Sequence, residues 1–191
     1  TGEIPVTKNV TIKNNSGESI TVSRNNASRV FNINSGKTVA IVGLTLSGGS
    51  AANGGAVLND GSLTIVNSTL SGNTATADGG AISTTATGTS LTLINTTLSG
   101  NHANGSGGGL ITLGGTVSIT NGTISNNTAH FDNNSTGIGG GIHAQAGTVI
   151  LKNTIVAGNL NADGGPGVAD DISGTVDTTA AASFNLIGAG G

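Results

Sequence analysis

The chain has 191 residues, of which 34 are Gly and three are Phe, and it contains no Cys, Met, Trp or Tyr. Without cysteine it holds neither a disulfide framework nor a thiol site, and a net charge of −3 with so few rings disfavours nucleic-acid binding. No apolar run approaches the length of a membrane span, so we expect no membrane insertion in this segment.

Residues 1–37 form the first and least regular section. Alternating β-branched residues predict strands at 10–12, 20–22 and 30–33. The section carries five basic residues against two acids, a sum of +3, whereas residues 38–191 carry one Lys against seven Asp, a sum of −6. Because sequence position maps to axial position in a stack of repeats, we expect opposite charge at the two ends, or else an uneven scatter of a few charges.

Residues 38–162 repeat one pattern five times. The copies are anchored on Gly43, Asn67, Asn95, Asn121 and Asn153, which lie 24, 28, 26 and 32 residues apart. Aliphatic residues recur four and two positions before the anchor and three positions after it. Alternation with a period of two predicts short strands, and no helical stripe is present. A repeat of this length indicates units that bury their apolar faces on one another.

Glycine pairs followed by apolar residues also recur, as at Gly79-Gly80-Ala81-Ile82. Glycine permits a tight corner and a close approach of the backbone between short strands. The predicted fold is therefore all-β: a right-handed, single-stranded parallel β-helix of about seven coils of roughly 26 residues, with three short strands per coil. Residues 163–191 lose the repeat and gain acids, which predicts a loop and a last strand near 184–187 within one continuous domain.

Several strings resemble a known family. They are ASRVFNINSG at 27–36, NSTLSGNTA at 67–75, GGAI at 79–82, IVAGN at 155–159, DISG at 171–174 and NLIG at 185–188. The chain resembles the bacterial right-handed parallel β-helix repeat proteins with a choice-of-anchor Q region. It is more distantly similar to the polymorphic outer-membrane protein repeats of chlamydiae, whose Phe-x-x-Asn string fits residues 31–34. The resemblance implies a large secreted or surface-anchored bacterial protein, usually without assigned chemistry.

Two sets of asparagines and one set of hydroxyl residues form polar columns. We expect stacked amides at the corners to satisfy each other's hydrogen bonds, in the columns Asn67, Asn95, Asn121 and Asn153 and Asn73, Asn101, Asn127 and Asn159. We expect an outward hydroxyl face formed by Thr45, Thr69, Thr97 and Thr123 with Ser47, Ser71, Ser99 and Ser125. Such a face could order water as ice-binding solenoids do, or simply provide polar filling.

Acidic and histidine residues are the remaining candidates for chemistry. Asp170 and Asp171 are the only adjacent carboxylates, and with Asp163 they form a weak candidate for calcium, although no calcium motif is matched. The favoured interpretation is a solvated acidic loop. His102, His130 and His143 share no column, so we expect neither a metal site nor a triad, and the insert at 130–132 is either a binding loop or a plain surface insert.

Three functions remain open from the sequence. The first is a non-enzymatic extracellular module, secreted or at the cell surface, that acts as a structural or adhesive spacer or as a filament subunit. Its expected partners are further copies, by end-to-end stacking, or neighbouring segments of a longer solenoid, and no cofactor is expected. The second is a protein that binds or degrades polysaccharide on a lateral face, as other β-helices do. The third is ice or surface-water binding through the hydroxyl face.

Overall fold

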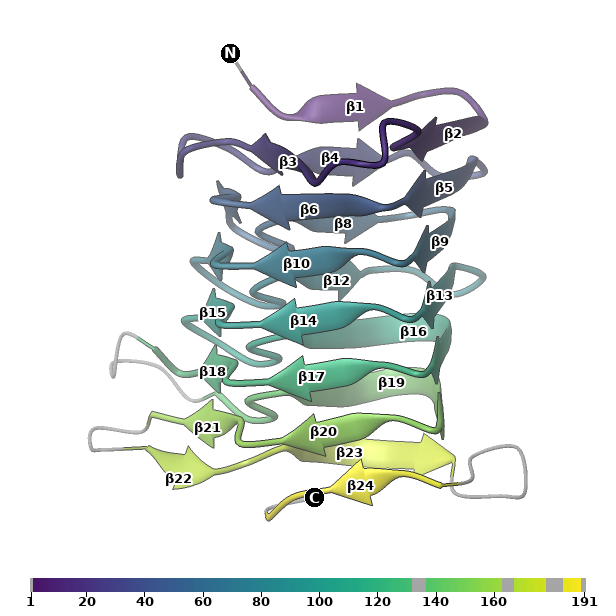
Figure 1. Ribbon diagram of the computed structural model, residues 1–191. Helices are drawn as coiled ribbons and strands as arrows, with labels where there is room; N and C mark the ends of the chain where they lie inside the picture. The colour runs from purple at the N-terminus through teal and green to yellow at the C-terminus, as the bar shows by residue number, and fades with distance from the viewer. Residues whose placement is uncertain (1, 132–136, 163–166, 178–183, 190–191) are drawn as a thin grey trace.

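The structure is a computed structural model that describes residues 2–131, 137–162, 167–177 and 184–189. The described residues form strands and turns without a helix, so none of them could cross a membrane as a helix. The strands are wound into a stack of coils that runs from the N-terminal end to the C-terminal end of the molecule (Figure 1). The predicted parallel β-solenoid is therefore confirmed.

The coils contain the following strands in chain order. The first has β1 (Ile4–Val6), β2 (Val10–Lys13) and β3 (Ile20–Ser23). The second has β4 (Phe31–Ile33), β5 (Thr38–Val42), β6 (Leu44–Ser47) and β7 (Ser50–Ala51). The third has β8 (Val57–Asn59), β9 (Ser62–Val66), β10 (Thr69–Ser71) and β11 (Thr74–Ala75). The fourth has β12 (Ile82–Thr84), β13 (Ser90–Ile94), β14 (Thr97–Ser99) and β15 (His102–Ala103).

The later coils have longer strands. They contain β16 (Leu110–Thr120), β17 (Thr123–Ser125) and β18 (Thr128–Ala129), then β19 (Ile142–Lys152), β20 (Ile155–Ala157) and β21 (Leu160–Asn161). The last, incomplete coil has β22 (Val168–Ala169), β23 (Ile172–Asp177) and β24 (Leu186–Ile187). The stack has about six turns, close to the seven expected.

Three sheets of 11, 7 and 6 strands surround the core. The largest sheet takes two segments from each early coil, such as β8 and β9, and these segments fuse into the single strands β16 and β19 in later coils. Nearly all pairing is parallel between successive coils; β22 is the exception, since it runs antiparallel to β21. The N-terminal strands at 4–33 pair in register with the regular coils, so the irregular first section belongs to the same stack.

The predicted aliphatic columns lie inside the solenoid in consecutive register. Val39 is paired with Leu63, Leu63 with Leu91, and Leu91 with Val117. The column after the anchor likewise pairs Leu46, Leu70, Leu98, Ile124 and Val156 in succession. These side chains are almost completely buried. Each coil therefore buries its apolar face on the next, which is why the repeat pattern specifies the fold.

Glycine is required where the third sheet turns back into the first. A Cβ atom on Gly80 would lie 2.1 Å from the carbonyl oxygen of Gly108, and one on Gly108 would lie 2.4 Å from that of Gly140. The obstacle is the backbone of the next coil, which has no side chain that could move away. The glycine pairs in the sequence thus mark the corner at which successive coils approach most closely.

Candidate functional site

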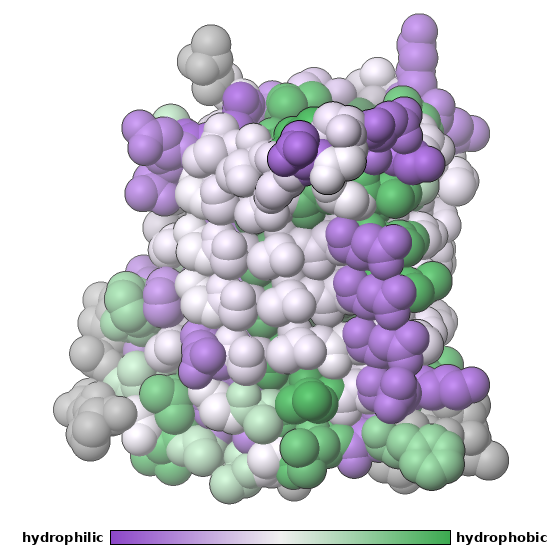
Figure 2. Space-filling view, viewed as in Figure 1, coloured by the Kyte–Doolittle hydropathy of each residue, from purple (hydrophilic) through white to green (hydrophobic). Residues whose placement is uncertain are grey.

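The exposed asparagine column is set by backbone conformation. Asn67, Asn95, Asn121 and Asn153 all have positive φ, between 49° and 54°, and Gly43 takes this place in the earlier coil with φ of 70°. Asparagine is one of the few residues that adopts this left-handed conformation readily. The Nδ2 groups of the last three amides each donate to the Oδ1 atom of the asparagine in the preceding coil, at 3.0, 3.0 and 2.6 Å. In Figure 2 a hydrophilic stripe runs along the stack beside the paler face.

The second asparagine column is buried and more extensively bonded. Asn73, Asn101, Asn127 and Asn159 have no exposed surface. The Oδ1 atom of Asn127 accepts from the backbone N–H of Asn101 at 3.0 Å and from its Nδ2 group at 2.9 Å. The Nδ2 group of Asn127 also donates to the carbonyl oxygen of Leu98. The same pattern recurs along the column, so the amides connect the coils through the interior of the corner.

Asp171 ends the buried column. This carboxylate is 1% exposed, and its Oδ1 atom accepts from the backbone N–H of Asn159 at 2.8 Å and from its Nδ2 group at 2.7 Å. Asp170 has a different partner, because its Oδ2 atom accepts from the backbone N–H of Gly139 at 2.7 Å. The two carboxylates therefore serve different segments instead of meeting as an acid and base couple. Asp163 lies outside the described residues, within which no group of three or more His, Cys, Asp or Glu could hold a metal ion.

The hydroxyl columns form the outer surface of the sheet that contains β6, β10, β14 and β17. Thr45, Thr69, Thr97 and Thr123 are paired in register, as are Ser47, Ser71, Ser99 and Ser125. These side chains are half-buried, and within the described residues their hydroxyls make no hydrogen bond to protein. Figure 2 shows this face as a largely pale area, of intermediate hydropathy, beside the hydrophilic stripe. Neighbouring hydroxyls are about 4.8 Å apart across coils and about 6.7 Å apart along a strand.

The hydroxyl face extends further towards the N-terminus than we predicted. Thr21 and Ser23 on β3 pair with Thr45 and Ser47, and the Thr-x-Ser string at 21–23 was the available signal. Towards the C-terminus the threonine column becomes apolar at Ile155 and Leu186. The flat hydroxyl surface therefore spans the coils from β3 to β17.

The three histidines occupy separate places. His102 on β15 stacks on the exposed ring of Phe131, with ring centroids 4.2 Å apart. Burial lowers the pKa of His102, and it lowers the pKa of His143 despite the opposing effects of a hydrogen bond to the Ser173 backbone and of nearby Asp78 and Asp170. His130 is buried, and its own backbone has a positive φ. Asp132, in the insert at 130–132 that is either a binding loop or a plain surface insert, lies outside the described residues.

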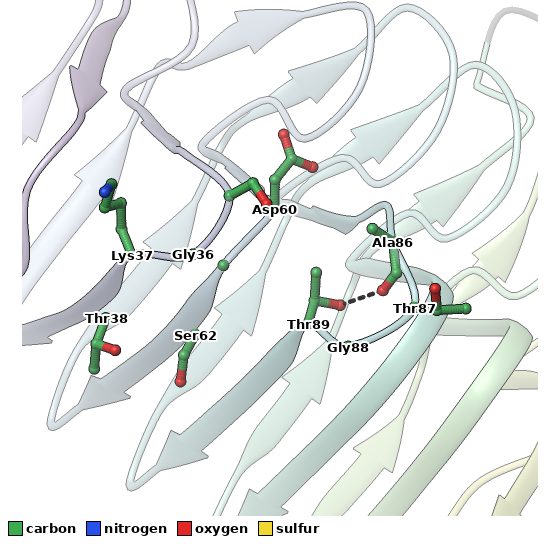
Figure 3. Close-up of a pocket in the computed structure, with 11 residues that line it drawn as sticks. Gly36, Lys37, Thr38, Asp60, Ser62, Ala86, Thr87, Gly88 and Thr89 are labelled. Atoms are coloured by element: carbon green, nitrogen blue, oxygen red, sulfur yellow. Dashed lines mark hydrogen bonds between the residues drawn. The ribbon is translucent and has the colours of Figure 1, made fainter.

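A shallow hollow of about 380 Å³ lies over three loops that connect the segments of the largest sheet. Its lining includes Lys37, Asp60 and Thr89 (Figure 3). The hydroxyl of Thr85 donates to Asp60, and that of Thr89 donates to the carbonyl oxygen of Ala86 at 2.8 Å. Turns and hydroxyls provide the other lining groups, and no aromatic ring is among them. The lining of the hollow contains one cationic side chain but no pair of groups arranged for acid–base chemistry.

Comparison with protein-family models, with curated proteins and with solved structures found no match to this chain. Function is therefore inferred from the geometry. That geometry assigns the most regular polar groups to connections between coils, and it leaves the hydroxyl face and the two ends of the stack as the surfaces available for contact.

Proposed function

We propose that this chain is a rigid, non-enzymatic structural module that works as a spacer or adhesive segment outside the cell. The observation that carries the proposal is the uninterrupted stacking of aliphatic columns, together with buried amides that join four successive coils from Asn73 to Asn159. Adjacent coils are tied by backbone pairing, core packing and side-chain amides, a combination that resists bending. Asp171, the buried member of the Asp170–Asp171 pair, accepts hydrogen bonds from Asn159 and so belongs to the same structural column.

Composition and resemblance support an extracellular location. A chain without Cys and Met lacks the usual sites of sulfur oxidation, which suits an oxidising environment. The strings at 27–36, 67–75 and 171–174 resemble the bacterial choice-of-anchor Q β-helix proteins, a family of secreted or surface-anchored proteins.

Rigidity can be tested with spin labels, because the chain has no native Cys. Asn15→Cys and Lys152→Cys place labels on exposed residues about five coils apart, which corresponds to about 24 Å along the axis. We expect one narrow distance distribution by pulsed electron spin resonance. A control pair on one coil, Asn67→Cys with Gly72→Cys, reports the width that the labels themselves contribute. A distribution for the distant pair that is much broader than the control would contradict a rigid spacer.

The polysaccharide alternative has its own test. The wild-type chain and the double variant Asp170→Asn/Asp171→Asn are incubated with a panel of acidic and neutral polysaccharides, and new reducing ends and unsaturated products are measured. We expect no product from either protein. Turnover by the wild type that disappears in the double variant would overturn the non-enzymatic proposal.

A second candidate function is the ordering of water or ice on the hydroxyl face. It is favoured by the hydroxyls between β6 and β17, which lie in register and have no protein partner within the described residues. The variant Thr69→Lys/Thr97→Lys should abolish any thermal hysteresis or inhibition of ice recrystallisation. The matched variant Thr64→Lys/Thr92→Lys, on the outer side of β9 and β13, should retain it. Absence of both activities in the wild type would remove this candidate.

A further inference from the structure

The aliphatic core is open at the N-terminal end of the stack. Ile4, Val10 and Ile20 are 40%, 40% and 39% exposed. Their partners in the next coil, Phe31, Val39 and Leu44, are 3%, 2% and 5% exposed. The terminal residues therefore occupy inward positions of the repeat but lack a covering coil within the described part of the chain.

The C-terminal end presents the other side of the same columns. Val176 on β23 is paired with Val149, and Ile187 on β24 is paired with Val156. Both are only partly buried, although they pack against the core. Ile172 ends the column that begins at Ile4. Ile172 is itself buried, so the uncovered terminal members of shared aliphatic columns are Val10 and Val22 at one end and Val176 and Ile187 at the other.

Backbone groups at the two ends are also complementary. Along a parallel strand, the backbone groups of successive residues form hydrogen bonds alternately with the neighbouring strand on one side and with that on the other. Arg24 donates its N–H to the carbonyl oxygen of Ser47, so the backbone groups of Thr21 and Ser23 face away from the stack. At the other end the N–H groups of Leu186 and Gly188 donate to carbonyl oxygens in or next to β20, so the backbone groups of Ile187 face away from the stack. Because β3 and β24 run in the same direction within one sheet, β24 of one copy can add in parallel to β3 of another.

The other strands at the two ends cannot pair with a further coil. Ile4 in β1 donates its N–H to the carbonyl oxygen of Val30, so the backbone of Pro5 faces away from the stack. Because proline has no N–H, β1 lacks a donor for a further strand at this edge. The third sheet begins only with β7, and at the opposite end β22 closes it by running antiparallel. The strands with complementary open edges are therefore β2 and β3 at one end and β23 and β24 at the other. Residues 1–37 carry a net charge of +3, and Asp170, Asp171 and Asp177 lie in the last coil, which favours contact between unlike ends.

We infer that a second copy of this chain docks end-on, with its β23 and β24 adding in parallel to β2 and β3, so that copies assemble head to tail. The inference rests on the proposed structural function and names its partner. Val176 then covers Val10, and Ile187 covers Val22, as each inward residue covers its counterpart in successive coils. The contact joins two different surfaces in the same orientation, so it generates an open filament rather than a closed dimer.

Two lysine substitutions on β3 test the contact. Ile20→Lys places a charge in the open end of the core, whereas the matched control Thr21→Lys places it on the outer face of the same strand. In sedimentation velocity over a wide range of protein concentration, we expect wild type and Thr21→Lys to form oligomers of increasing length. We expect Ile20→Lys to associate at least tenfold more weakly. A wild type that stays monomeric throughout, or equal weakening by both variants, would overturn the inference.

A mixing experiment tests the polarity. Ile20→Lys keeps its C-terminal end, so it should bind the N-terminal end of a wild-type oligomer and stop growth there. We expect substoichiometric Ile20→Lys to shorten wild-type oligomers, whereas unchanged oligomer length would overturn head-to-tail assembly. The spin-label distances of the Asn15→Cys/Lys152→Cys variant distinguish this inference from the proposed function. A narrow distribution in a chain that never oligomerises removes the inference and leaves the rigid module standing.

Discussion

At the residue scale, asparagine has a different structural role in each of the two asparagine columns. In the exposed column Asn is selected by a left-handed backbone, for which Gly43 is an equivalent solution. In the buried column the Oδ1 atom of Asn accepts two hydrogen bonds from the preceding asparagine, and its Nδ2 group donates to a backbone carbonyl oxygen of the preceding coil. In every bond between neighbouring members of the buried column the donor lies in the earlier coil and the acceptor in the next one, so the carboxylate of Asp171 fits as the last acceptor.

Replacing one asparagine in each column by glycine separates these roles. Asn101→Gly removes the side-chain acceptor of the buried N–H group of Asn73 and one acceptor of its Nδ2 group, and it should lower the free energy of unfolding by about 2 to 4 kcal/mol. Asn95→Gly removes an exposed amide at φ of 49°, which suits glycine, and should change it by less than about 1 kcal/mol. Urea unfolding followed by circular dichroism measures both. Equal losses would show that the buried amides do not hold the coils together.

Asp171 can be tested as the end of the buried column. Asp171→Leu removes the acceptor for both donors of Asn159 and should lower the free energy of unfolding by about 2 to 3 kcal/mol. Asp171→Asn keeps an acceptor oxygen in the same place and should cost less than half as much. Thermal unfolding with and without millimolar Ca²⁺ provides the comparison with a metal site. A calcium-dependent stabilisation of the wild type that Asp171→Asn abolishes would contradict the structural role.

Histidine burial predicts an acid-sensitive stability. The pKa values of His102 and His143 are lowered in the folded chain, chiefly by desolvation. The unfolded chain therefore binds more protons, so stability should fall as pH decreases below about 6.5 and continue to fall until the lowered pKa values are passed. Urea midpoints at pH 7.5 and pH 5.5 measure the effect. The variant His102→Gln/His143→Gln should show a smaller difference between the two pH values, and an unchanged difference would assign the effect to other groups.

At the element scale, each coil is limited by how closely backbones approach at its corners. A Cβ on Gly108 would lie 2.4 Å from both the carbonyl oxygen of Gly140 and the carbonyl carbon of Thr128. Gly100 instead has φ of 61° and open space, with nothing within 4 Å of the place that a Cβ atom would take, and Asn126 occupies the same position of the repeat with φ of 55°. Gly108 is therefore required by close packing, whereas Gly100 is required only by its φ.

These two glycines give opposite predictions. Gly108→Ala should separate adjacent coils and lower the free energy of unfolding by about 3 kcal/mol or more, as overpacking against fixed backbone does. Gly100→Asn should be nearly neutral, because asparagine tolerates positive φ and the next coil already uses it. Thermal unfolding of both variants measures the difference. A stable Gly108→Ala chain would require the corner to move apart without loss of pairing.

The inward columns could be predicted from the sequence because stacked parallel coils demand the same type of side chain at each level. Leu63, Leu91 and Val117 are aligned by the pattern and by the structure alike. The fusion of two segments into β16 and β19 could not be predicted, since it depends on irregular pairing around Thr112 and Leu113. The antiparallel return of β22 could not be predicted either, because the repeat has ended there. For that reason Asp171 read as an acid in a loop, although it completes the asparagine column.

At the scale of the whole molecule, stability depends on how many neighbours a coil has. Central coils are paired on both sides, whereas β1, β2 and β3 and the strands β22 to β24 are paired on one side within the described residues. In a quasi-linear stack each missing neighbour removes an interface term, so the chain should open from its ends.

Hydrogen exchange followed by mass spectrometry tests this order of opening at a protein concentration low enough to keep the chain monomeric. We expect the slowest exchange in β9, β10, β13 and β14, which lie in the middle of the stack, and the fastest in β1 and β24. Asn101→Gly should raise exchange most in the coils on either side of it, because the lost hydrogen bonds connect those coils. Uniform exchange along the chain, with an equal rise everywhere in the variant, would mean that the solenoid unfolds as one cooperative unit instead of coil by coil.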